Sequence, residues 1–188
     1  MQVVARSRCL IFLVLASSGC LLDLATKRWI FDKLGMPGGQ TWWLWSGVFG
    51  FQTSLNEGAL FGVGQGSVPL LALLSVAAAL AILYWLFLAG GARSLLITIA
   101  LGSITAGILG NLYDRLGVPH LKWHFAGHGH IPGDPVYAVR DWILVMLGNY
   151  PWPTFNLADS MLVCGAILML WQAFRGDEPI KKAEPGHG

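Results

Sequence analysis

The sequence predicts an α-helical membrane protein with four transmembrane helices, a small extracytoplasmic β-sheet and a short interfacial helix. Hydrophobic residues make up 55% of the 188 residues, charged residues make up only 12%, and the mean hydropathy is +0.59. A soluble domain of this size carries about 25% charged residues. The chain also contains several stretches close to the roughly 20 apolar residues that cross a bilayer. These observations exclude an ordinary soluble domain.

Four apolar segments are long enough to form the transmembrane helices. They run over about residues 9–26, 68–89, 94–113 and 155–174. The second contains no charged residue at all, and the first follows two arginines. We therefore expect residues 1–175 to form a single integral membrane domain. The polar residues 176–188 are expected to form a disordered cytoplasmic tail.

The distribution of basic residues gives the expected orientation. With four spans both termini lie on one side, and six basic residues then fall on each side of the membrane. That count alone does not orient the chain. Lys27, Arg115 and Arg140 each lie within four residues of an aspartate and can pair with it at the membrane face. We therefore expect cytoplasmic termini, with residues 28–67 and 116–154 on the other side.

The first of these external segments carries the pattern of short strands. Phe49, Phe51, Thr53 and Leu55 alternate with smaller or polar residues, and a period of two with aromatic and β-branched side chains is typical of a half-buried strand. The tryptophans of the "WWLW" run at residues 42–45 suit the headgroup level of a bilayer. A small sheet on the outer membrane surface is expected here.

The second external segment contains an apolar run, "VYAVRDWILVML", over residues 136–147. This run is too short to span a bilayer and too apolar to lie free in water. We expect an interfacial helix there, or a strand followed by a helix.

Composition also bears on partners and redox state. The basic residues are scattered, so no basic stripe indicates nucleic-acid binding. Cys9, Cys20 and Cys164 are odd in number and lie in apolar segments. Buried free thiols are therefore expected rather than a disulfide framework.

Polar and charged residues cluster at the expected outer ends of the spans, where burial in lipid costs several kcal/mol. They are Asp23, Lys27, Asn111, Asp114, Arg115, Asp141, Asn156 and Asp159. Asp23 and Lys27 are four residues apart and share a helix face. Snorkelling and helix capping explain single positions of this kind, but snorkelling accounts for lysines and arginines better than for aspartates. The cluster as a whole indicates a functional site.

A pair of aspartates at one site points to a definite reaction. Two nearby carboxylates do not ionise together easily, so one pKa rises and a proton is shared. Such a pair can activate a water and protonate a carbonyl, which is peptide hydrolysis without a covalent intermediate or a metal. Nucleophilic schemes fit less well, because Ser160 lacks a G-x-S-x-G context and Cys164 has no basic neighbour in its span.

Five motifs occur in one order along the chain. They are "DLATK" (23–27), "NEGALFG" (56–62), "AGILGNLYDR" (106–115), "VRDW" (139–142) and "FNLADS" (155–160). In this order they resemble bacterial lipoprotein signal peptidase, signal peptidase II. The resemblance implies four transmembrane helices with cytoplasmic termini, a small periplasmic sheet, and a multi-pass enzyme of the inner membrane with its site at the periplasmic face. It also implies an aspartic endopeptidase that cuts diacylglyceryl-modified prolipoproteins just before the lipidated cysteine.

The same resemblance implies a role for each matching residue. Asp141 and Asp159 would be the catalytic pair. Asn111, Arg115 and Asn156 would shape the site and contact the substrate. Asp23 and Lys27 would support it from the first span, and Asn56 from the external loop. No cofactor or metal is implied; the expected partners are lipid-modified prolipoproteins and membrane lipids, without nucleic acid, and the expected state is a monomer.

The first span itself looks like a lipoprotein signal, because "SSGC" ends at Cys20. Ser17 stands where a lipidation site prefers an aliphatic residue, and the apolar run continues beyond Cys20 to Ala25. We expect Cys20 to be a core thiol of this helix and residues 1–19 to be retained.

The sequence departs from the family pattern in two places. Ala106-Gly107 replaces an expected Gly-Gly pair, a small change compatible with close helix packing. An insertion over residues 116–137 contains four histidines, His120, His124, His128 and His130. Such a tract can bind zinc or form a polar periplasmic flap. Two alternative functions therefore stay open: a metal-dependent membrane hydrolase that uses this loop, and a non-catalytic protein that binds lipidated chains.

Overall fold

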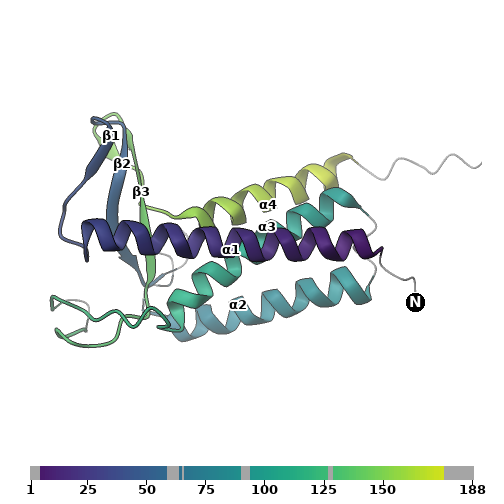
Figure 1. Ribbon diagram of the computed structural model, residues 1–188, viewed down its shortest axis with the longest axis horizontal. Helices are drawn as coiled ribbons and strands as arrows, with labels where there is room; N and C mark the ends of the chain where they lie inside the picture. The colour runs from purple at the N-terminus through teal and green to yellow at the C-terminus, as the bar shows by residue number, and fades with distance from the viewer. Residues whose placement is uncertain (1–4, 59–63, 65, 90–93, 127–128, 176–188) are drawn as a thin grey trace, which may run out of the picture.

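The computed structural model describes residues 5–58, 64, 66–89, 94–126 and 129–175. It contains long helices α1 (Arg6–Leu34), α2 (Val68–Leu83), α3 (Leu95–Arg115) and α4 (Leu157–Arg175), with a π-helical turn, η2 (Tyr84–Leu88), continuing α2. Figure 1 shows the helices lying side by side and a sheet standing across one end of them. The tail 176–188, expected to be disordered, and residues 90–93 between the second and third spans lie outside the described residues.

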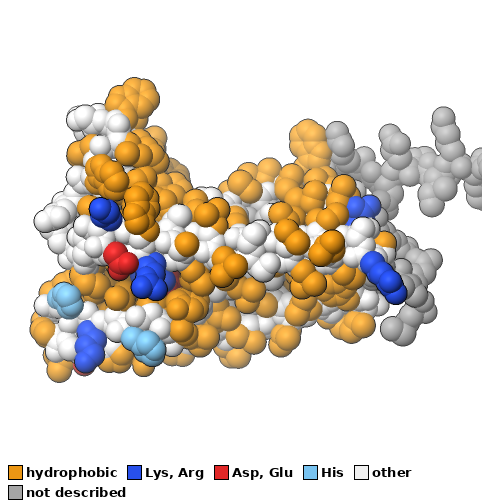
Figure 2. Space-filling model, in the orientation of Figure 1, with side chains coloured by type: hydrophobic (Ala, Val, Ile, Leu, Met, Phe, Trp, Pro, Cys, Tyr) orange, Lys and Arg blue, Asp and Glu red, His pale blue; other side chains and the backbone are white. Residues whose placement is uncertain are grey.

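The four helical segments are long and apolar enough to cross a membrane. Hydrophobic side chains cover the sides of the helical part, while charged and histidine side chains lie near its two ends (Figure 2). A helix surface of this kind is stable in lipid rather than in water. The expected class, an α-helical membrane protein with four such helices and a small sheet, is therefore confirmed.

Helix α3 is the centre of the bundle. In its apolar 18-residue stretch half of the residues are buried, whereas 11–17% are buried in the corresponding stretches of the other three helices. Small residues allow the close approach: a Cβ on Gly107 would meet the carbonyl oxygen of Ala158 and the side chain of Leu162. The glycine of the "AGILGNLYDR" motif thus brings α3 against the first turns of α4.

The sheet is antiparallel and has the order β1-β2-β3-β4. Its strands are β1 (Trp42–Trp45), β2 (Phe49–Asn56), β3 (Val139–Leu147) and β4 (Tyr150–Pro151). The strands expected from the alternating pattern in residues 28–67 are therefore present. A register shift between Phe51 and Ser54 lets Asp141 pair with Ser54 in the middle of the sheet.

For residues 136–147 the prediction of an interfacial helix is wrong, whereas the strand of the alternative prediction is present. The segment is strand β3, hydrogen-bonded to β2 on one side and β4 on the other. Residues Val139–Leu144 are all buried, so the strand lacks the alternation that marks a half-exposed one. A continuous apolar run does not distinguish a buried strand from a helix by period alone.

Helix α1 continues to Leu34, beyond the end near residue 26 that its hydropathy indicates. The polar residues that interrupt the apolar run do not end the helix, because Asp23 and Lys27 are fully buried. Ile30 and Phe31 are also buried, and Ile30 packs in one cluster with Phe51 and Trp142 of the sheet. The last turns of α1 therefore support the sheet.

Candidate active site

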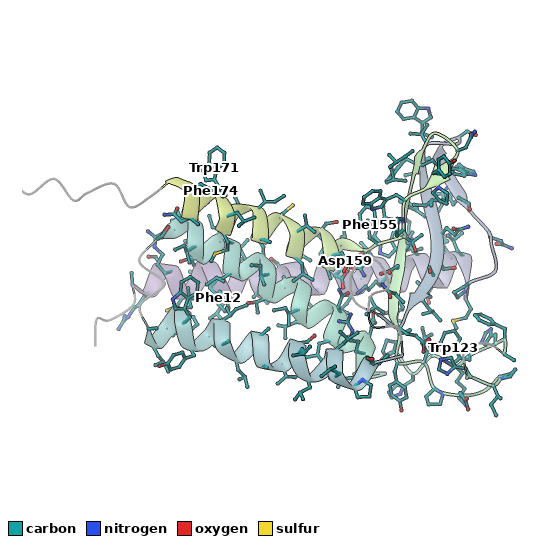
Figure 3. The ribbon with its side chains drawn as sticks, turned by 180° about the vertical axis from the view of Figure 1, so that it is seen from behind. Phe12, Trp123, Phe155, Asp159, Trp171 and Phe174 are labelled. Atoms are coloured by element: carbon teal, nitrogen blue, oxygen red, sulfur yellow. The ribbon has the colours of Figure 1, made fainter. Side chains whose placement is uncertain are left out.

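The polar residues singled out by the sequence meet where helices α1, α3 and α4 reach the sheet. Asp23 and Lys27 come from α1, Asn111 and Arg115 from α3, Asn56 and Asp141 from β2 and β3, and Asn156 and Asp159 from the start of α4. Figure 3 shows Asp159 at this junction, far from Phe12 at the other end of the bundle.

Lys27 lies at the base of this cluster and is fully buried. Its Nζ is 2.8 Å from Asp23 Oδ2 and 3.1 Å from Asp114 Oδ2, and it donates to Asn111 Oδ1 at 2.9 Å. The contact with Asn111 is a hydrogen bond, and the contacts with the two aspartates are ion pairs. The buried charge is thereby paired, which the low dielectric of the interior requires.

Asp114 lies between two cations. Besides Lys27, it accepts from Arg140: the guanidinium Nε and Nη2 are both 2.8 Å from Oδ1, and the backbone N–H of Arg140 reaches Oδ2 at 3.1 Å. This places the residue before Asp141 in β3 against the end of α3. Asp114 therefore connects α1, α3 and β3.

Asp159 is held by a reciprocal capping arrangement at the N-terminus of α4. Asn156 Oδ1 accepts from the backbone N–H of Asp159 at 2.9 Å, and Asp159 Oδ2 accepts from the backbone N–H of Asn156 at 3.2 Å. This is the capping-box pattern, here with Asn and Asp. It fixes the Asp159 carboxylate at the first turn of the helix.

Asp141 receives hydrogen bonds from two side-chain amides. Asn156 Nδ2 donates to its Oδ1 at 2.6 Å, and Asn56 Nδ2 donates to its Oδ2 at 3.2 Å. Asn156 thus contacts both aspartates. Its Nδ2 donates to the Asp141 carboxylate, and its Oδ1 accepts from the backbone N–H of Asp159. The two carboxylates that the "VRDW" and "FNLADS" motifs provide therefore share one bridging residue.

Asn111 joins this pair to the buried lysine. Its Oδ1 accepts from Lys27 at 2.9 Å and from Asn156 at 3.2 Å, and its Nδ2 donates to Asp159 Oδ1 at 2.8 Å. The lysine, the asparagines and the two aspartates form one connected network. A network that satisfies its members in this way rigidifies the groups in it.

The surroundings of Asp141 favour its protonated form. Burial and, second, the charge of Asp159 raise the pKa of Asp141 to about 8, against the smaller opposing effects of Asn156, Lys27 and Asn56. At neutral pH Asp141 therefore keeps its proton in the ground state. Such perturbed carboxyl pairs are typical of acid–base catalytic sites.

Comparison with known proteins identifies the family of this chain. The sequence model described as "Signal peptidase (SPase) II" matches residues 15–175. The chain belongs to the signal peptidase II family. It is 47% identical over 170 residues to a lipoprotein signal peptidase of Rhodopirellula baltica, covering 89% of this chain and 73% of that protein. A lipoprotein signal peptidase of Clostridium novyi is 32% identical over 152 residues, covering 80% and 88%.

A solved structure of a bacterial membrane enzyme, determined by the in meso method, has the same fold. Its TM-score is 0.72 with 22% identity, and the match covers 93% of this chain and 94% of that one. A second structure of a bacterial membrane enzyme, also determined by the in meso method, gives a TM-score of 0.68. The resemblance to signal peptidase II seen in the five motifs is therefore confirmed for the family and the fold.

A cavity of about 420 Å³ opens beside Asp159 in this signal peptidase II chain. Its walls are mainly apolar and come from the loop before α4 and from one face of that helix. The lining residues are Asn56, Trp152, Pro153, Thr154, Phe155, Asp159, Ser160, Val163 and Cys164. The cavity places apolar walls next to Asn56 and Asp159 of the polar network, which suits a ligand with an apolar part and a reacting polar part.

The remaining expected residues occupy less central places. Arg115 Nη2 donates to the carbonyl oxygen of Gly58 at 3.1 Å and so holds the chain just after β2. The free cysteines are more exposed than expected, since Cys164 is exposed and Cys9 and Cys20 are half-buried. In lipid such thiols face acyl chains rather than water, so their apolar sequence context did not require protein burial.

The histidine-rich insertion shows no metal-ligand cluster within the part of the chain that the structure describes. His128 lies outside the described residues. His130 instead stacks on Trp123, with ring centroids 4.5 Å apart and an angle of 12°, and contacts Glu57. In the described part, the insertion thus contributes a packed hairpin near the site.

Two contacts near the site were not predicted from the sequence. Arg140 was read only for orientation, although a lone arginine in the middle of an apolar run signals a buried partner. The backbone N–H of Ala158 donates to Asp23 Oδ1 at 2.9 Å, so Asp23 also caps the start of α4. No sequence signal joins residues 135 positions apart.

Proposed function

We propose that this chain is a lipoprotein signal peptidase that removes signal peptides from diacylglyceryl-modified prolipoproteins, with Asp141 and Asp159 as its catalytic pair. The observation that carries the proposal is the Asn156 side chain, which contacts both aspartates, while Asp159 lines an apolar cavity. Membership of the signal peptidase II family supports the substrate class.

The pair acts by sharing one proton. Asp141 holds it at neutral pH, because its pKa is raised to about 8, and Asp159 carries the charge. Asp159 then removes a proton from a water, which attacks the scissile carbonyl, while Asp141 donates its proton to the carbonyl oxygen. The tetrahedral diol collapses when the proton gained by Asp159 passes to the leaving amine and Asp141 takes back the hydroxyl proton. The supporting amides of Asn111 and Asn156 keep both carboxyls in place throughout.

The arrangement of the helices accounts for the position of the cut. The site lies at the sheet end of the bundle, at the ends of α1 and α3 and the start of α4, which corresponds to the periplasmic face of the inner membrane if the termini are cytoplasmic. A lipidated cysteine at that face leaves its acyl chains in the bilayer. The apolar wall formed by Phe155 and Val163 contacts these chains and positions the bond before the cysteine.

Replacing Asp141 or Asp159 with Asn tests the proposal directly. Each substitution preserves shape but removes the ionisable group, so release of the signal peptide should fall by about 10⁴-fold. The assay uses the purified monomeric protein in detergent with a lipidated prolipoprotein, and mass spectrometry locates the cut. Asp32→Asn serves as control, because that carboxylate is 71% exposed on α1 and should leave the rate unchanged.

Each alternative function has its own outcome in the same assay. If either Asn variant cuts at the wild-type rate, the catalytic pair is wrong. A wild-type protein that binds the lipidated substrate without ever cutting it would identify the non-catalytic binder. Loss of activity with a chelator and its return with zinc would identify the metal-dependent hydrolase; we expect a chelator to have no effect.

A further inference from the structure

The insertion after α3 forms a hairpin that folds back against the sheet. Its two arms are joined by hydrogen bonds from Trp123 N to Asp134 O and from Val136 N to Leu121 O, both 2.9 Å. A backbone bridge between Lys122 and Pro135 lies between them. Residues 121–123 and 134–136 are therefore paired segments of the fold rather than independent polar loops.

Trp123 anchors this hairpin. It is 6% exposed and packs in one cluster with Val136 and Ala138, and Leu55 of β2 packs against the same cluster. A buried indole of this size dominates the energetics of such a small core. The hairpin is thus attached to the last residues of β2, which lead directly into the site.

His130 extends the anchor to Glu57, the charged residue directly after β2. Its ring lies flat on Trp123, and its Nε2 contacts Glu57 Oε1. Both side chains are largely shielded, with the histidine 26% and the glutamate 12% exposed. A shielded histidine–carboxylate contact is stronger than an exposed one.

Glu57 lies between two residues that contact the site. Asn56 Nδ2 donates to Asp141 Oδ2 at 3.2 Å, and the Gly58 carbonyl oxygen accepts from Arg115 at 3.1 Å. A turn closes the segment, because the Gly58 N–H donates to Asn56 Oδ1 at 2.9 Å. Any displacement of Glu57 therefore moves both neighbours.

We infer that Glu57 and His130 are positioning residues, which hold residues 56–58 in place so that the Asn56 amide stays on Asp141. The inference rests on the proposed function and adds to it a role for the histidine insertion. Neither side chain touches the reacting atoms. They act through Asn56, and the hairpin anchored by Trp123 is the fixed support.

The charged groups around these residues determine how the inference is tested. Glu57 faces His130, and in the hairpin itself the Asp134 carboxylate accepts from the Ile131 N–H at 3.0 Å. Asp141 is faced by Asp159 and Lys27 as well as by the two amides. Among these, only the Asn56 amide depends on the 56–58 segment, so loss of that hydrogen bond leaves the Asp141 carboxylate less stabilised.

The test compares His130→Ala and Glu57→Ala with the wild-type protein in the same detergent assay, over a range of pH. Each variant should lower kcat by about tenfold, and the double variant should be no worse than either single one, because both remove the same contact. The alkaline limb of the rate profile should also move to higher pH, since an amide donor favours the charged carboxylate. A loss of folded protein would instead lower the rate by the same factor at every pH and would leave the pH of the alkaline limb unchanged.

Two further variants keep the test decisive. Glu57→Gln retains an acceptor for the imidazole and should restore most of the activity. His124→Gln changes an exposed histidine of the same hairpin and should behave as wild type. If His130→Ala and Glu57→Ala keep the wild-type profile while Asp141→Asn is inactive, the inference is overturned and the proposed function stands. If Asp141→Asn is active, the proposed function itself fails.

Discussion

The Asn156 amide donates to Asp141 at 2.6 Å while the carbonyl oxygen of the same side chain accepts from the backbone N–H of Asp159 at 2.9 Å. One side chain therefore sets the relative position of two carboxylates on different elements, β3 and α4. The cap and the bridge use different atoms of the amide, so substitution can separate them.

Replacing Asn156 with Ser should abolish the bridge and keep the cap, because a serine hydroxyl caps a helix but has no second amide donor. We expect thermal stability close to wild type and a fall in kcat of about 10²-fold, since Asp141 loses its shortest hydrogen bond. Asn156→Ala removes both and should also lower stability by about 1 kcal/mol. Equal activity in the Ser variant and the wild type would show that the bridge does not matter.

The rate of cleavage should fall as the pH rises through about 8, where Asp141 loses the shared proton. The raised pKa means that the folded protein holds this proton where the unfolded chain, with an ordinary value of 3.8, has released it. Stability from this group is therefore lost as the pH rises from about 4 to about 8. The measurement is kcat/KM against pH, with the pair titrating as a unit.

The same reasoning gives a stability test that needs no substrate. Asp141→Asn cannot acquire a buried charge, so at pH 8 it should unfold at a temperature equal to or above that of the wild type. The difference in unfolding midpoint between the variant and the wild type should therefore not be lower at pH 8 than at pH 5. A lower difference at pH 8 would contradict the upward shift of the Asp141 pKa.

Lys27→Met should be among the most destabilising single substitutions in the chain. It leaves the buried carboxylates of Asp23 and Asp114 without their shared cation, which costs about 3–5 kcal/mol for a broken buried pair. Arg28→Met is the matched control, because Arg28 and Asp32 form an exposed pair at 3.6 Å with 83% and 71% of their side-chain surfaces accessible. Thermal unfolding in detergent should separate the two variants clearly.

Filling the apolar cavity should affect substrate binding more than chemistry. Val163 lines it, and Val163→Trp is expected to raise KM for the lipidated substrate by about tenfold, equivalent to ~1.4 kcal/mol. Ile167 lies one turn further along α4, is 57% exposed and does not line the cavity. An equal rise in KM for Ile167→Trp would show that the effect comes from the helix surface in general.

The features that could be read from the sequence are those with a local signal. Apolar runs identified the four helices, and alternation identified β2. The β3 segment was ambiguous because it is buried on both sides, and the end of α1 was missed because Lys27 looks like a terminating charge until its partners Asp23 and Asp114 are known. Burial of a charge depends on residues far away in the chain.

In the candidate site, too, the residues of local motifs could be predicted and the long-range contacts could not. Motif residues such as Asp141 and Asp159 were found by resemblance, and the structure brings them together. The contact of His130 with Glu57, 73 positions apart, depends on how a hairpin folds back on the sheet. Nothing in the composition of a histidine-rich insertion indicates which histidine packs and which stays exposed.

The hydrogen bond from the Ala158 N–H to Asp23 Oδ1 has a consequence for biosynthesis. Asp23 is made early and Ala158 near the end of the chain, so the cap on α4 forms only after the last helix has inserted beside the first. Asp159 is the next residue, and it takes its place in the same step. A nascent chain with three helices in the membrane therefore has Asp141 without Asp159, and the proposed catalytic pair is complete only when the bundle closes.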